Sequence, residues 1–372
     1  MRHYFVTGAT GAIGSTLACM LLSDPGNELS LLIRAASDDD ATARLRTLCD
    51  FWQMDPANVK RRVKLVRGDA ALPAFGLDAS QWNALTRTCS HIIHCAALVK
   101  MNLPLPQARQ SAMSTACNVI DMATASMEHG RFNKVEFLST VGVAGRRPGV
   151  LPEECVKGAR SFHNTYEQAK SEAEDLACAA VERGLPLTIH RPSMVVGDSR
   201  TGRIVHFQVF YHLVEFLSGR RTFGVFPSLD AASLDVVPVD YVAAAIACSS
   251  TMSSYAGRIL HLCSGSEHAV GLTVLQETVR TCLLARGERL PRRRFLPRRV
   301  FRAALPLLRT TAPASLRKAI GALPILLDYL GGAQTFGCER TRALLEPEGL
   351  ALPDPASYLP QVIDYYLDRK HS

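Results

Sequence analysis

The chain lacks several features that would set it apart from ordinary globular proteins. No apolar run in its 372 residues reaches the roughly 18–20 residues that span a bilayer, which argues against a membrane-spanning helix. It has neither an internal repeat nor a low-complexity linker. The first apolar segment starts almost at Met1, which leaves no room for a secretory or transit leader. We therefore expect a cytoplasmic globular protein of roughly two domains.

Cysteine pairs of the Cys-x-x-Cys type are also absent, although the chain has 11 cysteines. Several of them fall inside apolar segments, for example Cys19, Cys95, Cys248 and Cys263. We therefore expect reduced cysteines that pack in the core of a cytosolic protein, with no disulfide and no metal site.

Acidic residues are scarce in one segment, residues 286–309. The chain has 42 Lys and Arg against 34 Asp and Glu, a net charge of +8. Segment 286–309 contains nine arginines and a single acid, Glu288, so it accounts for the whole excess of positive charge. No binding motif with interleaved aromatic residues accompanies these arginines, which argues against nucleic acid as the partner.

A glycine-rich stretch follows the first apolar run, Tyr4-Phe5-Val6. Its glycines are spaced Gly-x-x-Gly-x-x-Gly, and an apolar helical pattern comes next. Strand, glycine turn and helix in this order are typical of a dinucleotide site. The glycines let a pyrophosphate approach the backbone, and the helix N-terminus offers N–H groups to it. We expect the cofactor to be bound here by Thr7, Gly8, Thr10, Gly11, Ala12, Ile13 and Gly14.

Apolar strand patterns alternate with helical patterns along most of the chain. We expect strands at residues 29–33, 63–66, 91–97, 135–138, 187–190, 233–237 and 258–263, and helices at 79–89, 107–128, 164–183 and 207–217. This rhythm predicts an α/β fold, a Rossmann-like doubly wound parallel sheet. From residue 264 the pattern is helical and broken by prolines. We expect residues 1–196 with 233–263 to form the NADP-binding Rossmann domain, and 197–232 with 264–372 to form a smaller, mostly helical substrate-binding domain.

Residues at the predicted strand ends indicate the kind of cofactor. Arg34 directly follows the second strand, where an acid would bind a ribose 2′-hydroxyl and an arginine suits a 2′-phosphate. This favours NADP (NADPH) over NAD, although a strand-end arginine can also lie in solvent. Asp69 either binds the adenine amino group or closes a turn. Ala96 and Ala97 leave room for the cofactor after the fourth strand, whereas we expect His94 to pack within that strand.

Three residues together predict hydride-transfer chemistry. Thr140 ends the fifth strand, and Tyr166 and Lys170 lie one turn apart on the next helix, so they face the same way. A tyrosine hydroxyl can protonate a carbonyl oxygen, and a nearby ammonium group should lower its pKa from about 10. The threonine hydroxyl donates a second hydrogen bond, and the lysine can also hold the nicotinamide ribose. The alternative is a surface tyrosine and lysine with no role in chemistry.

These motifs resemble the extended short-chain dehydrogenase/reductases, and finer features resemble their thioester reductase branch. That branch includes fatty acyl-CoA reductases and the terminal reductase domains of carboxylic acid reductases and nonribosomal peptide synthetases. In the family the catalytic hydroxyl lies five residues before a glycine, here Gly145, which selects Thr140 over Ser139. The resemblance covers roughly residues 3–265 and rests on Leu32-Ile33-Arg34-Ala35, His94-Cys95-Ala96-Ala97-Leu98-Val99, Phe137-Leu138-Ser139-Thr140-Val141, Arg191-Pro192-Ser193, Gly197-Asp198-Ser199-Arg200-Thr201-Gly202 and 234–242.

The resemblance also implies cofactor contacts at Pro192 and Ser193, as well as at Tyr166 and Lys170. Family members often have Asn at the position of Cys95 and Gly at that of Ser193, so nicotinamide contacts can differ here.

The implied function is NADPH-dependent reduction of a thioester to an aldehyde and, in a further step, to an alcohol. The sequence has no adenylation or carrier domain, so the acyl group would arrive in trans on CoA or on an acyl carrier protein. Two alternatives remain: another extended short-chain reductase that acts on a ketone, an alcohol or a sugar nucleotide, and a non-catalytic dinucleotide sensor.

The resemblance also gives segment 286–309 a role, because its arginines would steer a phosphate-bearing or acidic substrate carrier. The same pattern, with apolar residues on one helical face, is also consistent with contact with an anionic membrane surface or with a solvated face over core. The apolar stretch Leu316–Leu330 either lines an acyl pocket or belongs to the core.

Overall fold

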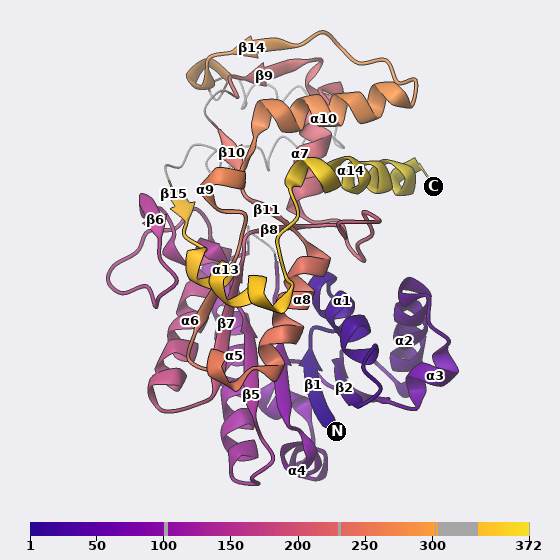
Figure 1. Ribbon diagram of the computed structural model, residues 1–372, viewed down its shortest axis with the longest axis vertical. Helices are drawn as coiled ribbons and strands as arrows, with labels where there is room; N and C mark the ends of the chain where they lie inside the picture. The colour runs from indigo at the N-terminus through magenta and orange to yellow at the C-terminus, as the bar shows by residue number, and fades with distance from the viewer. Residues whose placement is uncertain (100–102, 230–231, 302, 304–333, 372) are drawn as a thin grey trace.

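The computed structural model describes residues 1–99, 103–229, 232–301, 303 and 334–371 (Figure 1). Its centre is a seven-stranded sheet in the order β12-β7-β5-β4-β1-β2-β3, in which every neighbouring pair is parallel. The strands are β1 (Arg2–Thr7), β2 (Asn27–Ile33), β3 (Val63–Arg67), β4 (His91–His94), β5 (Lys134–Leu138), β7 (Leu187–Pro192) and β12 (Ile259–Leu262). The predicted doubly wound parallel sheet is therefore confirmed.

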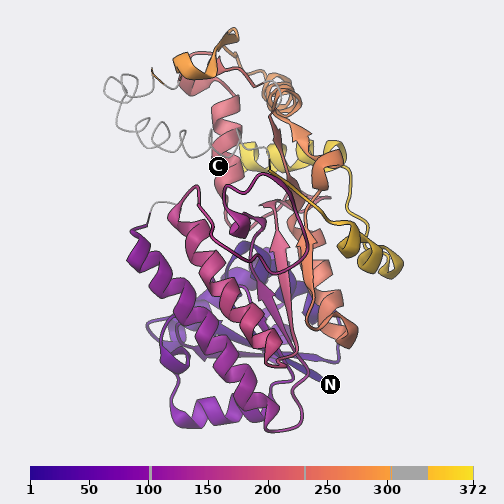
Figure 2. The ribbon, with the colours of Figure 1, turned by 90° about the vertical axis from the view of Figure 1, so that its left-hand side faces the viewer.

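Helices cover both faces of this sheet. One face is covered by α4 (Ala79–Thr88), α5 (Leu105–Met127) and α6 (Thr165–Glu182), and Figure 2 shows α5 and α6 side by side. The other face is covered by α1 (Ala12–Leu22), α2 (Asp38–Trp52), α3 (Pro56–Lys60) and α8 (Val239–Thr251). The chain runs outward in both directions from β1 and β4, so the crevice between them is the place where such sheets bind ligands.

Local sequence signals set where several helices begin. Ser37 and Asn164 accept the backbone N–H groups of Asp40 and Glu167, which caps α2 and α6. Asp78 forms a capping box with Gln81 at the start of α4. The helix predicted at 164–183 thus starts one residue later than expected, because Asn164 is its cap.

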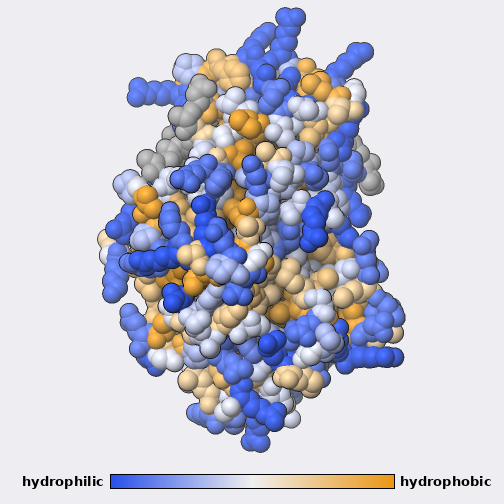
Figure 3. Space-filling view, viewed as in Figure 1, coloured by the Kyte–Doolittle hydropathy of each residue, from blue (hydrophilic) through white to orange (hydrophobic). Residues whose placement is uncertain are grey.

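A second layer lies above the carboxyl edge of the sheet, at the top of Figure 1. It contains α7 (Val209–Leu217), α10 (Leu272–Ala285), α14 (Pro355–His371) and the strand pair β9 (Val225–Pro227) and β14 (Arg294–Leu296). These elements share an apolar cluster of their own, with Phe210, Leu213, Leu275, Val362 and Ile363 fully buried. Hydrophilic side chains project from the top of the molecule in the view of Figure 3.

Short strand pairs and two short helices join the sheet to this layer. The pairs are β8 (Met194–Val196) with β11 (Val236–Pro238), β10 (Ser233–Leu234) with β13 (Val270–Gly271), and β6 (Gly149–Leu151) with β15 (Gln334–Phe336). The helices are α9 (Gly265–His268) and α13 (Glu339–Leu345). No helix within the described ranges combines the length and the apolarity needed to cross a membrane.

Three expectations about these parts need correction or fall outside the described residues. The strand predicted at 233–237 forms β10 and β11, which pair with β13 and β8 rather than joining the main sheet. The part after residue 264 includes the strands β13, β14 and β15, and is not helical throughout. The stretch Leu316–Leu330 lies outside the described residues.

The prediction that all cysteines are reduced is wrong for one pair. Cys155 and Cys178 form a disulfide, with Cα atoms 6.4 Å apart. They are separated by 23 residues, and α6 brings Cys178 against the loop that holds Cys155. A pairing of this kind depends on tertiary structure, which residue spacing does not reveal.

Candidate active site

The glycine turn forms a tight cradle at the start of α1. Gly8 has φ +73°, and a Cβ atom there would lie 2.6 Å from the backbone N of Ala96. The N–H of Gly11 donates to the carbonyl oxygen of Gly8 at 2.9 Å, and a Cβ on Gly14 would meet that same peptide group. Gly11 caps α1 without a side-chain acceptor, so the first N–H groups of the helix remain available to a phosphate. The cradle therefore fits a dinucleotide pyrophosphate.

Hydrogen bonds of Thr7 and His94 hold the backbone next to this cradle in place. Thr7 Oγ1 lies 2.9 Å from His94 Nδ1 and accepts the N–H of Ala96 at 3.4 Å, and both side chains are buried. Burial, and then the charge of Lys170, lower the pKa of His94 to about 3, so the ring is neutral. The prediction that His94 packs within the strand is confirmed. Thr7 joins β1 to the loop after β4, and its expected contact with the cofactor stays a prediction.

Arg34 and Asp69 lie together at the neighbouring strand ends. Arg34 Nη1 is 3.9 Å from Asp69 Oδ2, and the Arg34 side chain is 69% exposed. Asp69 Oδ1 also accepts the N–H of Ala71 at 3.0 Å, the turn interaction that the sequence left open as an alternative. Because its ion pair is long and exposed, Arg34 can turn toward a 2′-phosphate at little cost.

At the end of β5, Ser139 is buried whereas Thr140 is partly exposed. Ser139 Oγ donates to Glu174 Oε2 at 2.5 Å and is buried. Thr140 is half-buried and opens the turn Val141–Ala144, where its Oγ1 accepts the N–H of Gly142 at 3.2 Å. Accepting this bond leaves the Thr140 hydroxyl hydrogen available to a substrate oxygen.

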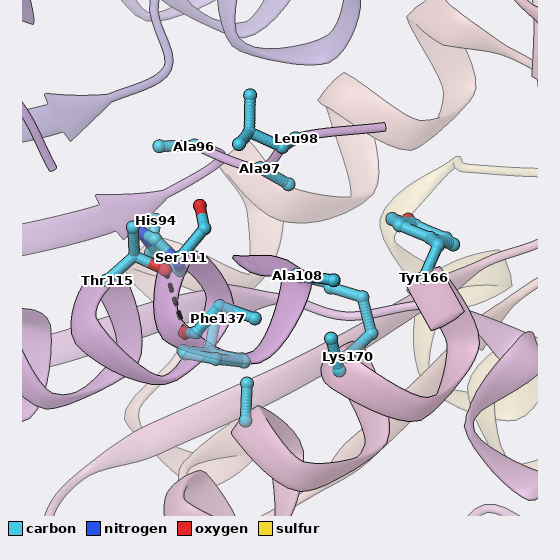
Figure 4. A pocket seen from close by; sticks show the side chains of 13 residues that line it. His94, Ala96, Ala97, Leu98, Ala108, Ser111, Thr115, Phe137, Tyr166 and Lys170 are labelled. Carbon is cyan, nitrogen blue, oxygen red and sulfur yellow. Dashed lines mark hydrogen bonds between the residues drawn. The ribbon is translucent and has the colours of Figure 1, made fainter. Parts of the chain in front are cut away.

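Tyr166 and Lys170 lie on the first turns of α6 and line one pocket (Figure 4). Lys170 Nζ donates to the carbonyl oxygen of Leu138 at 2.7 Å and lies 5.7 Å from the centre of the Phe137 ring. The pocket is closed by the loop after β4 and by one face of α5. Its lining comprises His94, Ala96, Ala97, Leu98, Ala108, Ser111, Ala112, Thr115, Phe137, Tyr166, Ala169, Lys170 and Ala173.

The α5 side of this pocket was not predicted from the sequence. Ala108, Ser111, Ala112 and Thr115 recur at helical spacing on one face of α5, and the Thr115 hydroxyl is bound to the carbonyl oxygen of Ala112 at 2.9 Å. A run of small residues at spacings of three and four could have indicated this face.

Burial shifts the pKa values of both α6 residues. The pKa of Tyr166 is raised to about 12, by burial first and by Glu167 second. The pKa of Lys170 is lowered to about 8 by burial, while Glu174 and Cys95 act in the opposite direction. The lowering of the tyrosine pKa that the sequence predicted is therefore not found, because burial and the neighbouring Glu167 carboxylate both raise it. Tyr166 keeps its proton at neutral pH and can act as a donor.

Pro192 and Ser193 lie at the same carboxyl edge but outside the pocket lining. The Ser193 N–H donates to the carbonyl oxygen of Leu262 at 3.0 Å. Burial raises the pKa of Asp235, and the Ser193 hydroxyl acts against this rise without cancelling it. Their contact with a cofactor stays a prediction.

The Gly-Asp-Ser-Arg-Thr-Gly stretch closes a loop between the two layers. Asp198 Oδ1 accepts the N–H groups of Arg200 and Thr201 at 3.0 and 2.9 Å. Ser199 donates its N–H and its hydroxyl to the two carboxylate oxygens of Asp240 at 2.8 and 2.6 Å, which ties the loop to the start of α8. In this structure the stretch therefore has a structural role, because it ties the loop to α8.

The arginines of segment 286–309 are partly neutralised by acids from other elements. Arg286 pairs with Asp364 and Asp368 on α14, and Arg293 lies 2.7 Å from Glu277 on α10. Arg302 and Arg309 lie outside the described residues. The segment therefore carries less free charge than its composition indicates.

Comparison with known proteins identifies the family. A model of an NAD-binding family, described as Male sterility protein, matches residues 6–246. The chain belongs to this family. It is 32% identical over 245 residues to the isonitrile lipopeptide synthase of Streptomyces coeruleorubidus, an alignment that covers 65% of this chain and 16% of the synthase. The chain spans between 5% and 18% of the length of this and two further curated relatives.

Solved structures give the same result for the fold. The terminal R domain from the myxalamid PKS-NRPS pathway superposes with a TM-score of 0.83 at 26% identity and covers all of this chain and 92% of its own. A thiolation-reductase di-domain from an archaeal nonribosomal peptide synthetase has a TM-score of 0.78 at 17% identity, over 100% of this chain and 76% of that one. These findings confirm the short-chain reductase family, its oxidoreductase class and a nicotinamide dinucleotide cofactor. They give no support to membrane contact.

Proposed function

We propose that this chain is an NADPH-dependent reductase that converts an acyl thioester to an aldehyde. The observation that carries the proposal is the pocket of Figure 4, in which Tyr166 and Lys170 face the small-residue loop after β4 at the edge that holds the glycine turn. The exposed Arg34 favours NADPH, because a guanidinium group suits a 2′-phosphate.

The chain's own residues supply the proton and orient the substrate and the cofactor. The cofactor, when bound at the cradle, supplies the hydride. Tyr166, protonated at neutral pH, donates a hydrogen bond to the substrate oxygen, and Thr140 donates a second one. Together they stabilise the negative charge that develops there, and Tyr166 gives its proton to the oxygen, which forms a thiohemiacetal. Its C–S bond then breaks as the C=O bond re-forms, the hydroxyl proton passes to the departing sulfur, and an aldehyde and a thiol are released. Lys170, buried between the Leu138 carbonyl and the pocket, would hold the nicotinamide ribose.

The thioester is proposed to arrive in trans, on a carrier protein or on CoA. The di-domain relative, which joins a thiolation domain to a reductase, supports the carrier. We also propose that residues 1–196 with 233–263 bind the cofactor and that residues 197–232 with 264–372 receive the acyl chain. The separate apolar cluster of α7, α10 and α14 supports this division.

The test is NADPH consumption by the purified protein with a graded series of acyl-CoA and acyl-carrier thioesters, with products identified by mass. The mass also shows whether reduction stops at the aldehyde. Tyr166→Phe should remove most of the rate. Tyr255→Phe, which makes the same chemical change in the turn before β12, at the opposite edge of the sheet, should leave the rate unchanged. Turnover with ketones or nucleotide sugars but with no thioester would refute the proposal.

A further inference from the structure

A buried ion pair lies directly behind the proposed catalytic residues. Arg191, in β7, has no exposed surface, and Glu174, in α6, is 1% exposed. Arg191 Nε and Nη2 donate to the two carboxylate oxygens of Glu174 at 3.0 and 2.6 Å. The pair is therefore bidentate, an arrangement that combines strength with geometric specificity.

The other N–H groups of Arg191 also have acceptors. Nη1 lies 3.3 Å from the Pro152 carbonyl oxygen and 2.9 Å from His261 Nε2, and Nη2 donates to the Glu154 carbonyl oxygen at 2.9 Å. His261 Nδ1 lies 2.6 Å from the Gly337 carbonyl oxygen, so Nδ1 carries the proton and Nε2 accepts from Arg191. All five N–H donors of the guanidinium are thus satisfied, which fixes its position.

The same carboxylate holds the end of β5. Ser139 Oγ donates to Glu174 Oε2, the oxygen that also accepts from Arg191 Nε. The next residue is Thr140, and Glu174 lies one helical turn beyond Lys170. One carboxylate therefore connects the strand that presents Thr140 to the helix that carries the other two catalytic side chains.

We propose that Glu174 and Arg191 are positioning residues, which hold Thr140 in register with Tyr166 and Lys170 through the hydroxyl of Ser139. The inference rests on the proposed function, because it assigns a task to the neighbour of a proposed catalytic residue. Burying this pair costs desolvation, and an apolar pair of the same size would often stabilise a fold as well. The ion pair also accepts a hydrogen bond from Ser139, the neighbour of Thr140, and an apolar pair could not form this contact.

Ser139→Ala tests the tether without leaving a buried charge unpaired, because Arg191 still neutralises Glu174. The matched control is Ser171→Ala. Ser171 is fully buried on the same helix, beside Lys170, and its hydroxyl has no hydrogen-bond partner among the described residues. For both variants we would measure kcat and KM with NADPH and an acyl thioester, and with a simple aldehyde. Urea unfolding and backbone hydrogen exchange over residues 139–145 complete the comparison.

We expect Ser139→Ala to lower kcat about tenfold, with KM for both ligands within about twofold of wild type, since small displacements of a catalytic group mainly affect the transition state. Exchange over residues 139–145 should accelerate in Ser139→Ala and stay unchanged in Ser171→Ala. Equal kcat and equal exchange in the two variants would overturn the inference. If the wild type reduces no thioester, the proposed function fails, but the aldehyde rates and the exchange data still decide the inference.

Discussion

Removal of the Arg34 side chain should weaken NADPH binding selectively. A hydrogen bond to a charged group is worth about 1.5–3 kcal/mol, and each 1.4 kcal/mol is about tenfold in Kd. Because the Arg34 side chain is 69% exposed, solvent screening favours the lower end of this range. Arg34→Ala should therefore raise the Kd of NADPH about tenfold. Removing the arginine would also leave the Asp69 carboxylate, whose Oδ2 lies 3.9 Å from Arg34 Nη1, without this partner at the proposed 2′-phosphate site.

The assay is a fluorescence titration of the free protein with NADPH and with NADH. The matched control is Arg67→Ala. Arg67 pairs in register with Ile33 on the neighbouring strand, but its guanidinium is held by Asp38 at 2.6 Å. NADH should bind Arg34→Ala as it binds wild type, and Arg67→Ala should bind both cofactors normally. Equal weakening of NADPH and NADH, or the same NADPH loss in Arg67→Ala, would refute this role of Arg34.

Three further predictions concern the cradle, the pocket lysine and the disulfide. Gly14→Ala should abolish cofactor binding, because its Cβ would overlap the Gly8 carbonyl oxygen. Gly11→Ala, whose Cβ would lie 3.2 Å from the same oxygen, should fold and bind the cofactor weakly; equal binding by both variants in calorimetry would contradict this. Burial lowers the pKa of Lys170 from 10.5 to about 8, so the folded state binds fewer protons between these values and stability rises with pH there. Lys170→Met should therefore be inactive yet raise Tm at pH 7, with a gain that shrinks toward pH 10.5; a lower Tm at pH 7 would contradict the burial argument. Reduction of Cys155–Cys178, which closes a loop with a separation of 23 residues, should cost about 3 kcal/mol in urea unfolding, and a double Cys→Ala variant should no longer respond to the reductant.

Much of the fold could be predicted because its signals are local. Parallel strands that are buried on both faces read as short apolar runs, and the caps at Ser37 and Asn164 lie next to the helices they start. The glycine turn is recognisable for the same reason, since its clash-free approach to Ala96 requires glycine at a fixed spacing.

The errors share a different origin, because each depends on residues far apart in the chain. The pairing of β10 with β13 and of β11 with β8, the Cys155–Cys178 disulfide and the α5 face of the pocket all come from tertiary contacts. The sequence predicts a lowered pKa for Tyr166, whereas burial raises it. Residue spacing shows that a lysine is near, but it does not show how completely the fold removes water from the two side chains.

Sequence and structure both bear on which hydroxyl, that of Ser139 or that of Thr140, serves the substrate. From the sequence, the distance to Gly145 in a resembling family selects Thr140. The structure gives an independent physical reason, because Ser139 is 3% exposed and its hydroxyl donates to Glu174. Serving a substrate would break that bond and leave a buried carboxylate with one donor fewer. Thr140 only accepts from Gly142, so its hydroxyl can donate to a substrate oxygen without cost to the fold. The two adjacent hydroxyls therefore differ in role: that of Ser139 anchors the strand to Glu174, and that of Thr140 keeps its hydrogen for a substrate oxygen.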